Sequence, residues 1–299
     1  MESATLTRAS PDSEQAARRT ALMRGSSIEV SSRDDGALDQ LADTLEPGAA
    51  VYINHAAGDT HHGIVAAAAR LRRAGFLPVP HIAARRLASF TQLRDFLARA
   101  RGEAEVEQVL VIAGDADHPT GPFDSSLDIL RTGLLQQHGI RRVGIAGHAE
   151  GHPKIAAAAL DRALRDKLAL AHRDGLAPFV VTQFCFEAAP ILAWIERLAA
   201  VGFDVPVRIG LAGPASVASL AKFAVRCGIG NSLRALVGRQ TSIARLVTET
   251  GPEPVIAALA AARLPAMVEG LHFFTFGGTA RTAAWRRHRI ERGFDRLPT

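Results

Sequence analysis

The chain has 299 residues, of which 47% are hydrophobic and 22% charged, enough for one large α/β barrel or two small domains. This composition excludes a disordered or fibrous protein, and no run approaches the roughly 18 consecutive apolar residues of a membrane helix. The formal net charge of +5 comes almost entirely from arginine, since only three residues are lysine. The first 14 residues carry no apolar segment of the kind found in secretion signals, so we expect a cytoplasmic protein that does not bind membranes.

Short β-branched apolar runs alternate with Ala-, Leu- and Arg-rich stretches of helical spacing along most of the chain. A first helix is expected within residues 14–23. Strands are then expected at 27–30, 50–54, 77–83, 108–114, 143–147, 179–186, 207–212 and 271–276. Helices are expected between them at 35–45, 60–74, 89–101, 125–138, 153–173, 188–201, 216–227, 232–248 and 254–263, with a basic helix at 281–292.

Eight strand–helix units within about 250 residues are typical of a (β/α)₈ barrel. The rival fold, an open doubly wound sheet, usually carries a G-x-G-x-x-G turn after its first strand. Here the first strand is followed by Ser31-Ser32-Arg33-Asp34, which favours the barrel. We therefore predict an α/β protein consisting of a single (β/α)₈ TIM barrel over residues 25–299, preceded by a helical extension over residues 1–24.

The basic helix predicted near the C-terminus has two interpretations. It could form a patch for nucleic acid or another anion, or it could be an ordinary solvated helix that packs through Ala283, Ala284 and Ile290. Aromatic residues are not interleaved with its arginines as they are in many nucleic-acid sites. We therefore favour the second interpretation and expect no nucleic-acid partner.

Polar residues occur at the ends of seven of the eight predicted strands. In a TIM barrel the catalytic groups lie at the carboxyl ends of the strands. Each unpaired buried polar atom costs about 1–3 kcal/mol, so this many polar groups predict one shared polar pocket. The residues are Glu29, Asn54, His55, His81, Asp115, His148, Glu150, His152, Thr182, Gln183, His272 and Thr275.

Glu29 and Asp115 are the strongest candidates for chemistry. Glu29 lies between Ile28 and Val30, where burial would raise its pKa and suit a general acid near neutral pH. The alternative is a rim residue that points to solvent. Asp115 follows Gly114, which permits close approach of a ligand, although an Asp here is also typical of a helix cap.

The candidate histidines lie on different strands and lack an H-E-x-x-H pattern, so we predict no metal site among them. Their imidazoles and the positive net charge suit a phosphate-bearing cofactor better.

Five motifs in order along the chain resemble the flavin-dependent methylenetetrahydrofolate reductases, of the bacterial type that consists of the catalytic domain alone. They are Pro80-His81-Ile82, Val111-Ile112-Ala113-Gly114-Asp115, Gly147-His148-Ala149-Glu150-Gly151-His152-Pro153, Val181-Thr182-Gln183-Phe184-Cys185-Phe186-Glu187 and Leu271-His272-Phe273-Phe274-Thr275. The resemblance implies a (β/α)₈ barrel that binds FAD and moves a hydride between nicotinamide, flavin and folate.

The resemblance also implies roles for individual residues. Glu29 would be the general acid for a folate nitrogen, and Asp115 would contact the pterin near the flavin. The implied substrate contacts are Gln183, which would serve folate or nicotinamide, Phe223, which would stack on the ligand, Asn54 and Arg281. The implied FAD contacts are His55, Ala57, His81, Ala113, Gly114, Asp115, Ser126, His148, His152, Asp161 and Lys167.

The chain departs from the family pattern at several of these positions. Ala113 stands where an Arg commonly precedes the Gly-Asp pair, and His148 replaces a Tyr. The implied activity is interconversion of 5,10-methylenetetrahydrofolate and 5-methyltetrahydrofolate, with NAD(P)H or another electron partner, and the oxidative direction would suit a demethylation pathway. The alternative is a non-catalytic flavin- or folate-binding barrel with a regulatory role. In either case we expect a homo-oligomer.

Overall fold

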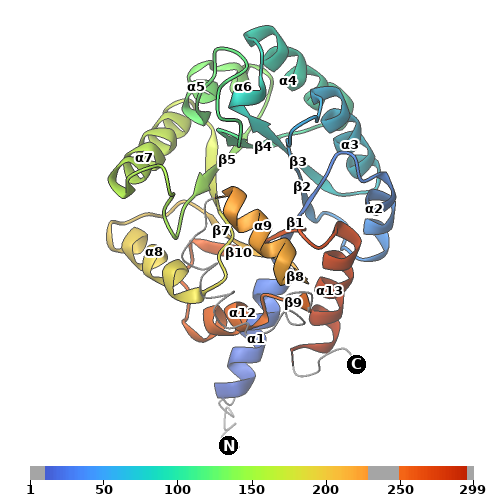
Figure 1. Ribbon diagram of the computed structural model, residues 1–299, viewed down its shortest axis with the longest axis vertical. Coiled ribbons are helices and arrows are strands. Elements are labelled where there is room, and N and C mark those ends of the chain that lie inside the picture. The colour runs from blue at the N-terminus through green and yellow to red at the C-terminus, as the bar shows by residue number, and fades with distance from the viewer. Residues whose placement is uncertain (1–10, 228–248, 295–299) are drawn as a thin grey trace, which may run out of the picture.

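The computed structural model describes residues 11–227 and 249–294. Eight parallel strands close into a barrel in the order β1-β10-β7-β6-β5-β4-β3-β2, and helices surround it (Figure 1). This arrangement confirms the prediction of a (β/α)₈ TIM barrel. Two further strands, β8 and β9, pair antiparallel in a separate two-stranded sheet.

The described elements follow the predicted alternation. The barrel strands are β1 (Ser27–Val30), β2 (Ala50–Ile53), β3 (Leu77–Ala83), β4 (Gln108–Ile112), β5 (Arg142–Gly147), β6 (Ala177–Thr182), β7 (Val207–Ala212) and β10 (Val268–Phe274). The small strands are β8 (Ala215–Ser216) and β9 (Glu249–Thr250). The α-helices are α1 (Pro11–Arg24), α2 (Asp35–Gln40), α3 (His61–Arg73), α4 (Phe90–Ala104), α5 (Ser126–Arg131), α6 (Leu134–Gln137), α7 (Ala157–Arg173), α8 (Ala188–Ala200), α9 (Val217–Cys227), α12 (Glu253–Ala261) and α13 (Thr279–Arg292). Two 3₁₀ turns, η1 (Leu41–Asp43) and η2 (Ala84–Arg86), complete the set.

Several predicted boundaries are wrong. The helix expected at 125–138 is two short helices, because Gly133 adopts a left-handed conformation with φ of 66° and interrupts it. The strands expected at 108–114 and 179–186 end at Ile112 and Thr182, so Ala113, Gly114 and Gln183 lie in loops. The helix expected from residue 153 begins only at Ala157. The last barrel strand begins three residues earlier than predicted, at Val268, and ends two residues earlier, at Phe274. The helix expected at 232–248 lies outside the described residues.

The inside of the barrel is packed rather than hollow over its middle layer. Gly144 makes room there, because a Cβ at this position would lie 2.7 Å from the Phe179 ring. The interior cluster consists of Tyr52, Val79, Leu110, Phe179 and Val181. This packing separates the two ends of the barrel, each of which has polar inward-facing residues.

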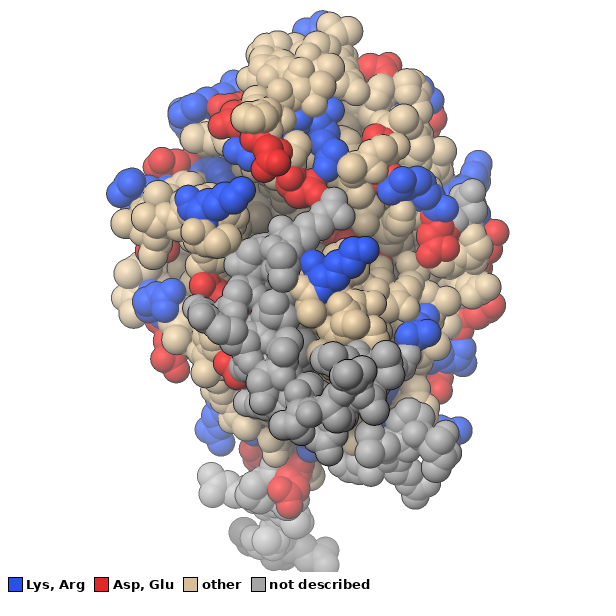
Figure 2. Space-filling model, viewed as in Figure 1, with Lys and Arg blue, Asp and Glu red and all other residues tan. Residues whose placement is uncertain are grey.

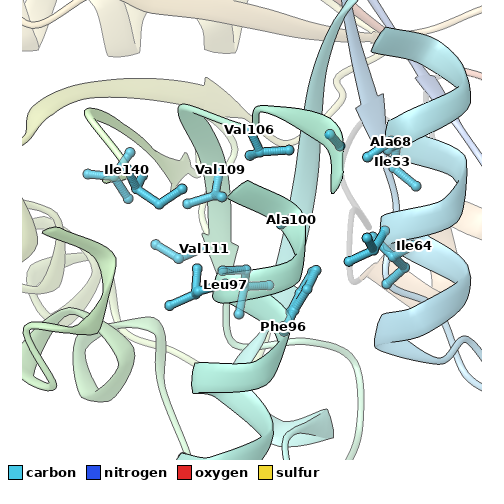
Figure 3. Close-up of a cluster of buried hydrophobic side chains, with 14 of the residues drawn as sticks. Ile53, Ile64, Ala68, Phe96, Leu97, Ala100, Val106, Val109, Val111 and Ile140 are labelled. Atoms are coloured by element: carbon cyan, nitrogen blue, oxygen red, sulfur yellow. The ribbon is translucent and has the colours of Figure 1, made fainter. Parts of the chain in front are cut away.

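The outside of the barrel is covered by helices through aliphatic contacts. Figure 3 shows Ile53, Val109 and Val111 of the strands beside Ile64 and Phe96 of α3 and α4. The apolar residues of each helix recur every three or four positions, which gives one buried face per helix. The scaffold that holds the strand ends is therefore built from large apolar clusters between the strands and the helices.

The C-terminal helix α13 is anchored in a way that the sequence did not indicate. Ala283 is buried as expected, but Ala284 is exposed, so that part of the predicted packing face is wrong. Two arginines are buried instead. Arg286 donates two hydrogen bonds to Glu46, at 2.8 and 3.1 Å, and Arg289 donates one to Glu253 at 2.7 Å. Buried arginines are tolerated because carboxylates compensate their charge.

The visible surface carries acidic and basic side chains interspersed rather than one patch of a single sign (Figure 2). Within the described ranges, no helix combines the length and apolar character needed to cross a membrane.

Candidate functional site

Glu29, Asn54 and His81 come together at the carboxyl ends of β1, β2 and β3. These strands are neighbours in the barrel, and alternation along each strand directs the three side chains inward. The Asn54 amide donates a hydrogen bond to Glu29 Oε1 at 3.5 Å, and His81 Nε2 lies 3.8 Å from Glu29 Oε2. Glu29 is only 8% exposed, so it is not a solvent-facing rim residue.

The surroundings of Glu29 favour its protonated form. Burial raises the pKa of Glu29 to about 7, against a smaller lowering by the Asn54 hydrogen bond. Burial, together with the nearby His55, lowers the pKa of His81 to about 3. His81 is therefore neutral and provides no cation to stabilise the carboxylate. Glu29 can consequently hold or release a proton near neutral pH.

A second buried histidine lies beneath this group. His272 Nδ1 is 2.9 Å from the Ser27 hydroxyl, and the Tyr52 ring lies edge-on to His272 at 4.5 Å and to His81 at 6.0 Å. Burial lowers the pKa of His272 well below its ordinary value. Among the described residues, His81 Nε2, His272 Nε2 and Asn54 Oδ1 find no hydrogen-bond partner. Unsatisfied buried polar atoms are rare in folded proteins, and two of these belong to Asn54 and His81, which contact Glu29, so they are available to a ligand at this site.

Asp115 lies in the loop after β4 and is held by an arginine from the neighbouring strand end. Arg86 of η2 donates a hydrogen bond to its carboxylate, and the backbone NH of Arg85 donates to the Ala113 carbonyl at 2.9 Å. Gly114 allows the turn through its φ of 92°. Sequence reasoning missed Arg86, although its position just after the predicted strand 77–83 was a usable signal.

His55 is close enough to both His81 and Arg86 to interact with them electrostatically, so it lies near both the Glu29 group and the Asp115–Arg86 pair. Its Nδ1 accepts a hydrogen bond from the Ala83 backbone NH at 3.3 Å. Burial and the neighbouring Arg86 lower the pKa of His55 to about 4, so this imidazole is also neutral.

A cluster of nitrogen donors lies after β5 and on α7. The rings of His148 and His152 are 5.8 Å apart in an edge-to-face arrangement. Burial, with smaller effects from His152 and Lys167, lowers the pKa of His148 to about 4. Burial also lowers the pKa of Lys167, whose ammonium makes no ion pair or hydrogen bond with a described residue. A half-buried cation of this kind favours an anionic ligand.

The remaining predicted residues are placed as follows. The Gln183 side chain lies after β6, and its Oε1 accepts a hydrogen bond from the Phe184 backbone NH at 3.1 Å. Phe223 of α9 stacks on Phe276 with ring centroids 4.2 Å apart, so in this structure it contacts a protein ring. Ser126 is buried in the first turn of α5, whereas Ala57, Asp161 and Arg281 are exposed. No described contact joins these four residues to Glu29.

Three other side chains are of the types that bind metal ions and lie close together. Ligand atoms of His61, His62 and Asp95 lie within 4.8 Å of one another, on α3 and α4. His61 Nε2 is 2.8 Å from Asp95 Oδ2, and the Gln92 amide nitrogen is 3.3 Å from His61 Nδ1. An amide donor at Nδ1 requires the proton to be on Nε2, which suits the hydrogen bond to Asp95 and leaves Nε2 unavailable to a metal ion.

No known family model matches the chain. The chain is similar to a protein of Pectobacterium carotovorum subsp. carotovorum named 5,10-methylenetetrahydrofolate reductase, with 28% identity over 159 residues. The matched region is 52% of this chain and 50% of that protein, so the chain spans about half the length of the curated relative.

Proposed function

We propose that the protein is a flavin-dependent oxidoreductase that interconverts 5,10-methylenetetrahydrofolate and 5-methyltetrahydrofolate. The observation that carries the proposal is the buried Glu29, whose pKa of about 7 and neutral neighbours fit an acid that acts near neutral pH. The named relative and the closed barrel support the same reaction.

Glu29 performs the proton transfer in this proposal. In the reductive direction its carboxylic acid protonates folate N10, which opens the five-membered ring of the substrate. In the oxidative direction its carboxylate takes the proton back when the ring closes. Asn54 holds Glu29 Oε1 in place, and the buried imidazole of His81 excludes water from Oε2 without stabilising its charge.

The residues present fit FAD. The unpaired ammonium of Lys167 and the neighbouring His148 and His152 offer donors for a diphosphate. Arg86 lies beside Asp115 and provides a guanidinium near the position where Ala113 replaces the Arg of the family pattern. When bound, FAD would supply the hydride-accepting and hydride-donating chemistry, while the protein sets its position.

The other site residues receive narrower roles. Asp115, fixed by Arg86, would face the pterin. Gln183 would contact folate and, where NADH or NADPH is the electron partner, the nicotinamide. Phe223 would exchange its stacking on Phe276 for stacking on a ligand, because both surfaces are aromatic and half-buried.

The test uses the purified full chain under anaerobic conditions. We expect a flavin absorbance band, loss of that band on mixing with 5-methyltetrahydrofolate, and its return on adding 5,10-methylenetetrahydrofolate. Separate arms with NADH and NADPH identify the electron partner. A colourless protein that takes up no added FAD would refute the proposal, and bound FAD that ignores both folates would favour the non-catalytic alternative.

A further inference from the structure

The end of the barrel opposite Glu29 contains a cavity. It has a volume of about 320 Å³ and lies among the amino ends of the strands. Its lining includes Tyr52, Gln108, Arg142, Phe179 and Arg208. We call it the amino-end cavity.

Positive charge in the amino-end cavity exceeds the negative charge beside it. Arg142 and Arg208 share a single carboxylate, Glu269, whose Oε2 is 4.0 Å from one guanidinium and 3.6 Å from the other. These distances are too long for hydrogen bonds. The pair of arginines therefore retains one net positive charge.

Arg286 also lines the cavity and uses its donors on Glu46 and Ser26, whereas Arg142 and Arg208 leave most of theirs unused. Arg208 donates to the Gly25 carbonyl at 2.8 Å, while Arg142 donates to no described residue. The Arg142 side chain is 42% exposed, and its guanidinium carbon lies 5.3 Å from the centre of the Phe179 ring, a cation-π contact that orients it toward the cavity. The cavity thus presents an oriented guanidinium with free donors.

Tyr52 adds a buried hydroxyl. The residue is 1% exposed, lines the cavity, and makes no hydrogen bond with a described residue. Burial raises the pKa of Tyr52 to about 12, so its hydroxyl stays protonated and can donate. Two guanidiniums and a hydroxyl give a cavity with a surplus of donors and a net positive charge, which is the chemistry that recognises an anion.

We propose that the amino-end cavity binds a small anion through its carboxylate or phosphate group, held by Arg142, Arg208 and the Tyr52 hydroxyl. This site is separate from Glu29 and does not depend on the proposed folate activity.

The test is a calorimetric titration of the full chain, saturated with FAD, with inorganic phosphate in one arm and citrate in the other. Chloride keeps the ionic strength constant. Saturable binding is expected for at least one of the two anions. Binding of phosphate or of citrate shows whether the cavity recognises a phosphate group or a carboxylate group. The absence of saturable binding in both arms overturns the proposal.

Variants locate the binding. Arg142→Gln should weaken the affinity about tenfold or more, because a charge-assisted hydrogen bond is lost. The matched control is Arg141→Gln, which removes the same charge from the adjacent residue, whose side chain is 72% exposed and outside the cavity lining. If both variants lowered the anion affinity equally, the binding would reflect nonspecific attraction to positive charge, and the proposed site would be refuted.

Tyr52→Phe provides an independent variant, because it removes the hydroxyl and keeps the packing of the ring. It should weaken binding several-fold while the circular dichroism spectrum stays unchanged. Wild-type affinity in both Tyr52→Phe and Arg142→Gln would place any bound anion elsewhere and contradict the proposal.

Discussion

The two ends of the barrel interior carry polar residues of opposite character. At the carboxyl end, Glu29 lies among neutral histidines, and its pKa is raised to about 7. At the amino end, Arg142 and Arg208 are permanently charged and share one carboxylate. Tyr52 lies between them, with its ring against His81 and His272, and it lines the amino-end cavity.

The difference shows how burial acts on different chemical groups. Burial without a counter-charge shifts the protonation of a carboxyl group, because the group can become neutral. The same burial cannot neutralise an arginine, which must instead find an anion. One end of the barrel is therefore suited to moving a proton and the other to binding charge.

The largest effect is expected at Glu29. Replacement by Gln should slow the anaerobic reoxidation of reduced flavin by 5,10-methylenetetrahydrofolate about 10²-fold or more, because the acid is lost. FAD affinity should be unchanged, since none of the proposed FAD donors is altered. Stopped-flow absorbance measures the rate. The control is Glu103→Gln, an exposed residue of α4, and a wild-type rate in Glu29→Gln would refute the acid role.

Arg286→Ala should produce the next largest effect, on stability. The Arg286 side chain is 2% exposed, and its guanidinium donates to Glu46, Ser26 and backbone carbonyls. Its loss should lower the free energy of unfolding by about 3 kcal/mol, because the buried Ser26 hydroxyl and carbonyl and the half-exposed Glu46 carboxylate all lose their donor. Urea unfolding measures the change. Arg287→Ala, at a half-exposed neighbour on the same helix, should leave stability almost unaffected, and similar curves for both variants would contradict this account.

The sequence was sufficient to predict the fold because the signals for it are local. Strands 27–30, 77–83 and 207–212 were predicted with their observed bounds, since apolar β-branched runs with clear flanking helices define them. The break at Gly133 was missed because apolar periodicity continues across it. The burial of Arg286 was also missed, because its partner Glu46 lies 240 residues away along the chain.

The candidate site was predicted only in part, for a similar reason. The rule that polar strand ends converge placed Glu29, Asn54 and His81 together correctly. It could not show that Arg86 pairs with Asp115, because that contact depends on the path of two loops. Nor could it show that His272 faces the interior beneath Glu29, which depends on how β10 pairs with β1.

The stability of the protein should depend on pH through Glu29. The pKa of Glu29 is about 7 in the folded protein, against 4.5 for an unperturbed Glu in the unfolded chain. Between these pH values the folded protein therefore binds more protons at Glu29 than the unfolded chain does. Glu29 therefore contributes stability that is lost as pH rises toward 7. Since Gln does not titrate, the Glu29→Gln variant should gain about 2 kcal/mol relative to wild type between pH 5 and pH 7.

Chemical unfolding of both proteins at each pH measures this difference. Histidines with lowered pKa values, such as His81, act in the opposite direction as pH rises, but they are common to both proteins and cancel in the comparison. Glu103→Gln should show no such trend. A constant difference between Glu29→Gln and wild type across the range would mean that burial does not perturb Glu29.

The smallest effect is expected at Asn54. Its amide donates to Glu29 Oε1 at 3.5 Å and lowers the pKa of Glu29, against the larger effect of burial. In Asn54→Ala the carboxyl group should therefore hold its proton to higher pH. Reoxidation of reduced flavin by 5,10-methylenetetrahydrofolate requires protonated Glu29, so its rate should fall as the pH rises. The midpoint of that fall, near pH 7 in the wild type, should lie at a higher pH in the variant. Rates measured by stopped flow from pH 6 to pH 9 test this, and a midpoint that stays in place or moves downward would show that Asn54 does not stabilise the carboxylate.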